Sequence, residues 1–117
     1  ILKIKKGKKI LENINDEIMV ITHYLFLDSI TKKNLNYPAR TFTSDGISLP
    51  VKGSKYFKKY QNFLLGKIKK KNIKKIYFFK HEGIYQTVLT DYLSPTCFNL
   101  SEDEIFNIVE LKCFELS

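Results

Sequence analysis

The chain of 117 residues is long enough for one domain, and its 44% hydrophobic and 27% charged residues are the mix of a globular fold. This composition excludes intrinsic disorder, and the longest apolar run, residues 18–27, is too short to span a bilayer. The net charge of +8 suits nucleic acid or an anionic membrane, yet all but one of the 20 basic residues are lysines. Only Arg40 offers the planar guanidinium that readers of bases and phosphates favour.

The sequence begins at Ile1, and residues 1–9 lack the apolar core of a signal peptide. We therefore expect residues 1–117 to form a single α/β domain that is a piece of a longer chain.

The first half of the chain predicts a helix, a strand and a long loop. Apolar side chains at helical spacing predict a short helix over residues 8–15, and an apolar run predicts a buried strand over 18–22. Residues 28–53 show no sustained period and predict a long loop, with short extended pieces at 40–43 and 47–51. Because long loops in compact domains are often functional, we expect a site here.

The second half begins with the clearest helix in the chain. Ser54 is a candidate N-cap, and the helix is expected to end near Asn72. Its predicted apolar face consists of Phe57, Tyr60, Leu64 and Ile68, with Phe63 beside them. A β-rich run then predicts a central strand over residues 73–79, and a second helix is expected over 83–93, ended by Pro95.

The C-terminal region predicts one helical turn and one strand. Residues 101–104, Ser-Glu-Asp-Glu, match a capping box, and residues 106–114 alternate as a strand whose direction stays open. The order of elements predicts a small layered α/β sandwich. Its sheet is expected to be mostly parallel, with three to five strands, flanked by two or three helices.

Charge is distributed unevenly along the chain. Residues 46–81 hold eleven lysines and no acid, whereas residues 82–117 hold seven acids and one lysine, that is +11 against −6. These two regions are expected to attract each other. The lysines of the predicted helix have three interpretations: a solvated face, a surface for anionic lipid headgroups, or a nucleic-acid surface. They are Lys55, Lys58, Lys59, Lys67, Lys69, Lys70 and Lys71. The interleaved aromatics Tyr56, Phe57, Tyr60 and Phe63 are interpreted as core or interface residues.

The long loop and its start contain the candidate substrate-contacting residues. These are Asp28, Arg40, Thr41 and Asp45, which ordinary turn chemistry also explains, since Asp45 precedes a glycine. His23 and His81 each follow a predicted strand, but no metal-ligand spacing accompanies them. We expect no metal, no cofactor and no catalytic residue in this chain.

Two cysteines lie near the last predicted strand. Cys97 and Cys113 are either a disulfide or two buried thiols, and the sequence leaves both open. In an oxidising compartment, a bridge closing about 15 residues would contribute about 3 kcal/mol.

A resemblance extends over about residues 16–115. It rests on residues 69–79, on Cys97-Phe98, and on the closing run 108–113. This pattern resembles the soluble C-terminal domain of bacterial multi-pass membrane proteins that are similar to dolichyl-phosphate-mannose-type glycosyltransferases. The resemblance implies a periplasmic domain that follows membrane helices of the same parent chain and carries no catalytic residue itself.

The first functional hypothesis is therefore a non-catalytic accessory domain of a membrane glycosyltransferase-like protein. It would contact an acceptor, a lipid-linked sugar or anionic lipid headgroups. The alternatives are a small basic nucleic-acid-binding module and a fragment of a small α/β enzyme that holds substrate in the 28–53 loop; a cytoplasmic location is the alternative compartment.

Overall fold

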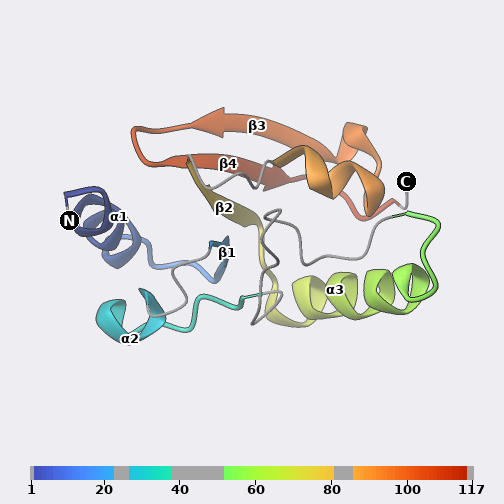
Figure 1. Ribbon diagram of the computed structural model, residues 1–117, viewed down its shortest axis with the longest axis horizontal. Helices are drawn as coiled ribbons and strands as arrows, with labels where there is room; N and C mark the ends of the chain where they lie inside the picture. The colour runs from blue at the N-terminus through green and yellow to red at the C-terminus, as the bar shows by residue number, and fades with distance from the viewer. Residues whose placement is uncertain (1, 23–26, 38–51, 81–85, 116–117) are drawn as a thin grey trace.

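A four-stranded mixed sheet organises the fold (Figure 1). The computed structural model describes residues 2–22, 27–37, 52–80 and 86–115. The strands, in their order across the sheet, are β1 (Ile18–Ile21), β2 (Lys75–Phe79), β4 (Phe106–Leu111) and β3 (Phe98–Glu102). The prediction of an α/β fold with a sheet of three to five strands is confirmed.

The prediction of a mostly parallel sheet is wrong. Only β1 and β2 run parallel, with Ile18 opposite Lys75, whereas β4 is antiparallel to both β2 and β3. The physical reason is that β3 and β4 form a hairpin with a three-residue connection, and strands joined by so short a connection must be antiparallel. The side chain of Asp103 fixes this turn by accepting hydrogen bonds from the N–H groups of Ile105 (2.8 Å) and Phe106 (2.7 Å).

Helices cover both faces of the sheet, as Figure 1 shows. On one face, α1 (Leu2–Glu12) and α2 (Leu27–Thr31) enclose a core that includes Val20 and Phe79. On the other face lie α3 (Phe57–Lys71) and the 3₁₀ helix η1 (Gln86–Asp91). Alternate residues of β1, β2 and β4 supply the two cores, because successive side chains of a strand point to opposite faces. Strand β3 has no buried residue and adds only the half-buried Phe98 to one core.

Several predicted elements have different limits in the structure. The N-terminal helix begins at Leu2, and α3 begins at Phe57 without the predicted Ser54 cap. A short helix, α2, opens the segment predicted as a loop. The described part of the predicted helix over 83–93 is the 3₁₀ helix η1. Residues 101–104 end β3 and enter the hairpin turn, so the capping-box interpretation is wrong.

The two edges of the sheet differ. Along β1, the segment after α2 covers the edge, because the Val20 N–H donates to the carbonyl of Leu35 at 2.9 Å. At the opposite edge, the register pairs Asn99 and Ser101 with β4 through backbone hydrogen bonds. The intervening Leu100 therefore turns its backbone groups outward, and its side chain is 59% exposed.

Two helical glycines provide a matched test of packing. A Cβ at Gly7 of α1 would lie 3.0 Å from Cε2 of Phe79, whereas a Cβ at Gly66 of α3 meets nothing within 4 Å. Replacing Gly7 by valine is expected to lower the free energy of unfolding by about 1–3 kcal/mol, because the added methyl groups overpack the core. The same change at Gly66 is expected to have little effect. Urea unfolding followed by circular dichroism measures both; equal effects at the two sites would contradict the close approach of α1 to β2.

None of the described helices has the length and apolar character that a bilayer span requires.

Candidate functional site

Most of the substrate-contacting residues predicted from sequence lie outside the described residues. These are Arg40, Thr41 and Asp45, together with the two extended pieces predicted at 40–43 and 47–51. His23 and His81 also lie outside them. Asp28 is placed in α2, one residue after its first position. The candidate surfaces that the structure does describe are a basic helix and a polar cleft.

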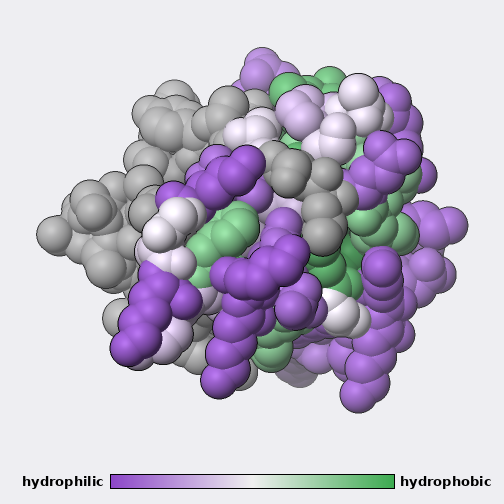
Figure 2. Space-filling model, turned by 90° about the vertical axis from the view of Figure 1, so that its right-hand side faces the viewer, coloured by the Kyte–Doolittle hydropathy of each residue, from purple (hydrophilic) through white to green (hydrophobic). Residues whose placement is uncertain are grey.

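The basic α3 surface consists of the seven lysines predicted from sequence. They are Lys55, Lys58, Lys59, Lys67, Lys69, Lys70 and Lys71, and all are exposed except the half-buried Lys67. No aspartate or glutamate occurs in α3 to neutralise them. Figure 2 views the molecule from the side where α3 begins and shows hydrophilic side chains standing out around smaller hydrophobic areas.

An exposed aromatic ring lies in the middle of this surface. Phe63 is 55% exposed, and residues 59, 63, 66 and 70 follow one another at the four-three-four spacing of a single helical stripe. This stripe lies opposite the buried side of α3, which contains Leu64 and Ile68. Tyr56, just before the helix, is 62% exposed. Tyr56 and Phe63 are therefore not core residues, and Lys59 and Lys70 flank the Phe63 ring along the helix.

Some lysines of this surface are tethered to the protein. The Lys67 ammonium donates to the carbonyl of Tyr37 at 3.1 Å, and the Lys69 ammonium lies 5.4 Å from the centre of the Phe114 ring. By contrast, Lys59 and Lys70 are exposed and stand on the outward stripe. The expected attraction between the basic middle and the acidic end has one described ion pair, Lys80 with Glu102 at 3.4 Å.

The buried side of α3 packs against Tyr92, the residue that follows η1. The side-chain amide of Gln61 donates to the carbonyl of Tyr92 at 2.9 Å, and the rings of Phe57 and Tyr92 stack at 4.9 Å. Burial raises the pKa of Tyr60 to about 12. The phenol is therefore neutral at physiological pH.

The structure joins Cys97 and Cys113 in a disulfide, with their α-carbons 4.8 Å apart. Cys97 is fully buried, and the backbone nearby is paired as well: the Lys112 N–H donates to the Cys97 carbonyl, and the Ser94 N–H donates to the Glu115 carbonyl. Glu115 lies close to the two sulfurs, but the bridge occupies both sulfur atoms. The bridge ties the C-terminal segment to the 3₁₀ helix η2 (Pro95–Cys97), which directly precedes β3.

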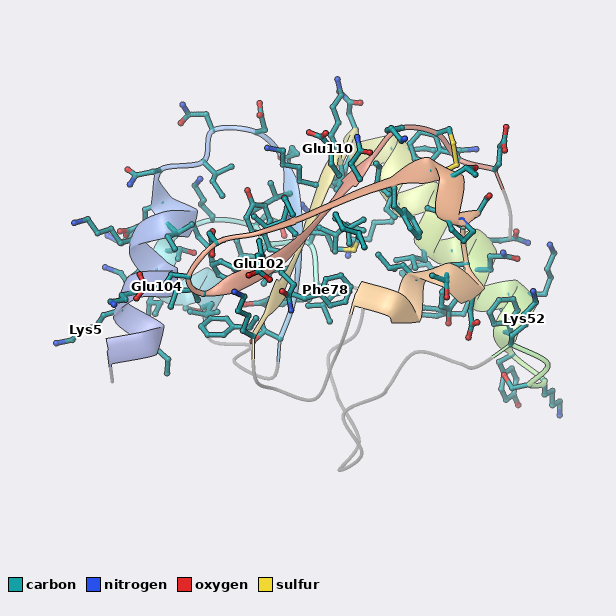
Figure 3. The ribbon with its side chains drawn as sticks, turned by 90° about the horizontal axis from the view of Figure 1, so that it is seen from above. Lys5, Lys52, Phe78, Glu102, Glu104 and Glu110 are labelled. Atoms are coloured by element: carbon teal, nitrogen blue, oxygen red, sulfur yellow. A yellow bond between two sulfur atoms is a disulfide. The ribbon has the colours of Figure 1, made fainter. Side chains whose placement is uncertain are left out.

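A polar cleft lies where β1 and β2 begin. Three cavities of about 220, 230 and 500 Å³ meet there, and Asp16 and Glu17 line all three. Glu110 of β4 lines the largest cavity, and Figure 3 shows it away from Phe78, toward the other end of the strands. Lys74, just before β2, lines two of the three cavities.

A buried asparagine, Asn36, orients the side chain of Glu17 at the cleft. Asn36 is 2% exposed, and its amide nitrogen donates to Oε2 of Glu17 at 2.9 Å and to the carbonyl of Ile18 at 2.8 Å. Its backbone is left-handed, with φ of 52°, and its Oδ1 has no hydrogen-bond partner. A buried polar atom without a partner costs about 1–3 kcal/mol. Asn36 therefore holds Glu17 in place at a cost to stability.

The cleft carries charges of both signs. Four lysines, Lys33, Lys71, Lys74 and Lys75, line it together with Asp16, Glu17 and Glu110. No ion pair joins these groups in the part of the chain that the structure describes. Tyr77 lines the same cavity, and burial, followed by the charges of Asp103 and Asp16, raises the pKa of its phenol. The Tyr77 hydroxyl thus stays protonated and can donate a hydrogen bond.

Sequence reasoning missed this cleft. Its residues come from four separate segments: 13–18, 33–34, 71–77 and the single position 110. The available signal was local, since Asp16-Glu17 and Lys74-Lys75 each immediately precede or begin an apolar strand. Because the two strands are parallel, both charged pairs lie at the end of the sheet where β1 and β2 begin.

Comparison with known proteins finds no matching family model, no similar curated sequence and no similar solved structure. The function must therefore be argued from the geometry of the two surfaces.

Proposed function

We propose that this chain is a non-catalytic accessory module that binds an anionic lipid surface through α3. The observation that carries the proposal is the exposed Phe63 ring within a lysine stripe on a helix that has no acidic residue. Helices that lie on membranes combine lysines, which attract anionic headgroups, with aromatic or aliphatic side chains that enter the boundary of the acyl chains.

The resemblance described above supports the same proposal, because it implies a domain next to membrane helices of its own parent chain. On that proposal, the domain lies on the periplasmic side of a glycosyltransferase-like protein and contacts lipid headgroups there. The membrane helices, the compartment and the activity of the parent chain are all parts of the proposal.

The first test neutralises the stripe. Replacing Lys59 and Lys70 by glutamine is expected to weaken binding to vesicles of phosphatidylglycerol and phosphatidylcholine roughly thirtyfold, because each lysine near an anionic surface contributes about 1 kcal/mol. Vesicle co-sedimentation measures the affinity. The control replaces Lys5 and Lys9, two exposed lysines of α1, by glutamine. Equal losses of vesicle affinity in the two variants would show that binding depends only on net charge, and would contradict binding through the α3 stripe.

The second test removes the ring. Replacing Phe63 by serine is expected to weaken vesicle binding by about 1–2 kcal/mol, which is the part of a phenylalanine transfer free energy that an interfacial ring gains. Leu100→Ser on β3 removes an equally exposed apolar side chain away from α3 and is expected to leave binding unchanged.

The nucleic-acid alternative predicts a different pattern. Tight binding of duplex or single-stranded DNA, with a steep salt dependence and a loss in the Lys59 and Lys70 variant, would replace the lipid proposal.

A further inference from the structure

We infer that the cleft at the start of β1 and β2 binds a small zwitterion that carries both an ammonium and a phosphate group, of the phosphoethanolamine class. This inference is independent of lipid binding by α3, because the two surfaces use different residues except for Lys71. Its starting point is that the cleft holds unpaired charges of both signs.

The exposed carboxylates that line the cleft favour a cation. Asp16 and Glu17 line all three cavities, and Glu110 adds a third carboxylate to the largest. Two helices also end beside the cleft: α1 ends at Glu12, shortly before β1, and α3 ends at Lys71, shortly before β2. The C-terminal end of a helix carries a partial negative charge of about half an elementary charge. An ammonium group is therefore stabilised by carboxylates and helix ends together.

A second group of side chains favours an anion. Lys71, Lys74 and Lys75 line the cavities of about 230 and 500 Å³. A phosphate monoester carries about −1.5 to −2 charges at neutral pH, so it can use more than one lysine, whereas a carboxylate carries a single charge. The protonated Tyr77 hydroxyl and the cleft asparagines supply further neutral hydrogen-bonding groups.

A hydrogen bond from the buried Asn36 orients the exposed carboxylate of Glu17 at the cleft. Asn36 is buried, keeps a left-handed backbone and leaves its Oδ1 without a partner while its amide holds Glu17 and the Ile18 carbonyl. Asparagine adopts a left-handed backbone readily, so the unfavourable feature is the unpartnered buried Oδ1. Such features concentrate where a side chain must be positioned for function. Binding of a ligand ammonium to Glu17 would use the orientation that Asn36 imposes.

The cavity sizes fit a compact ligand. The cavity lined by Asp16, Glu17, Lys71 and Lys74 measures about 230 Å³, and it opens beside the one of about 500 Å³. Ligand sites in proteins usually measure about 300–1,000 Å³, so the joined cleft can hold a zwitterion with part of a linked group. The ammonium and phosphate groups of this zwitterion occur in a free metabolite, and also in a lipid headgroup, where the phosphate is a diester with a single negative charge.

The test is a titration of the ¹⁵N-labelled chain, followed by two-dimensional NMR, with phosphoethanolamine, inorganic phosphate, ethanolamine and β-alanine in separate experiments. We expect phosphoethanolamine to shift the amides of residues 13–18 and 71–77, and to bind roughly tenfold or more tightly than any of the other three. Inorganic phosphate and ethanolamine each lack one of the two charged groups, and β-alanine carries a singly charged carboxylate in place of the phosphate. Equal affinity for inorganic phosphate, or shifts confined to residues 55–70, would overturn the inference.

Variants assign the two ends of the ligand. Lys74→Gln and Asp16→Asn are each expected to weaken phosphoethanolamine binding roughly tenfold, whereas Lys59→Gln on the α3 stripe leaves it unchanged. An unchanged affinity in both cleft variants would overturn the inference. Vesicles with phosphatidylethanolamine distinguish the sources: binding that depends on Lys74 assigns a lipid headgroup, and binding of only the soluble compound assigns a free metabolite. Loss of vesicle binding by the Lys59 and Lys70 variant tests the α3 surface separately.

Discussion

Replacing Phe79 by alanine is expected to lower the free energy of unfolding by about 3–5 kcal/mol, the largest effect of a single substitution that we expect. Phe79 is fully buried in the core beneath α1, its ring lies 5.0 Å from that of Phe106, and the backbone of Gly7 approaches its edge. Alanine would leave a cavity between β2 and α1. Helix α1 could fill this cavity only by moving toward β2, and that movement would break its other contacts.

Denaturant unfolding, followed by circular dichroism, measures this effect. The control is Phe63→Ala, because that ring is 55% exposed and its removal is expected to change stability by less than about 0.5 kcal/mol. If the Phe79→Ala chain does not fold, Phe79→Leu gives a smaller and measurable loss. A loss at Phe79 no greater than that at Phe63 would contradict the packing of α1 on the sheet.

Removing the disulfide is expected to have the second large effect. A chain with alanine at both Cys97 and Cys113 is expected to lose about 3 kcal/mol of stability, because the unfolded chain regains the freedom that a bridge over a separation of 16 residues removes. Alanine is chosen because Cys97 is fully buried and serine would bury a hydroxyl group.

Reductant provides the internal control for this prediction. Dithiothreitol is expected to lower the unfolding midpoint of the native chain and to leave that of the double-alanine variant unchanged. A native midpoint that does not respond to reductant would contradict a stabilising bridge. The sequence left the state of the cysteines open, because cysteine count and spacing do not show how far apart two residues lie in the fold. In the structure their α-carbons are 4.8 Å apart, within the range of disulfides.

Periodicity and apolar runs predicted the elements that lie near the centre of the fold. The apolar run of β1 and the helical spacing of Phe57, Leu64 and Ile68 in α3 reflect burial, and burial is what a hydrophobic pattern records. These elements indicated the α/β class. The position of the lysines on α3 was also predictable. The exposure of Phe63 was not, because Phe63 is adjacent in sequence to the buried Leu64, and an apolar pattern alone does not separate the two.

The predictions failed where the pattern is partly polar or depends on contacts distant in sequence. Strand β3 is an edge strand with exposed side chains, so its polar residues resemble a loop, and Asp103 caps a hairpin turn with the same side chain that caps a helix. Helix α1 was predicted too short because Gly7 interrupts it, although the packing of Phe79 requires this glycine. The cleft could not be foreseen before the strand order was known.

The unequal edges of the sheet limit how copies of this chain could assemble. A filament of continuous sheet needs two open edges on every copy, one to join each neighbour. In the described part of the chain, the segment around Leu35 already occupies the β1 edge, while the outward backbone groups of Leu100 leave the β3 edge open. Strand pairing between copies could thus join two β3 edges around a twofold axis and would then stop, so sheet-mediated growth ends at a pair.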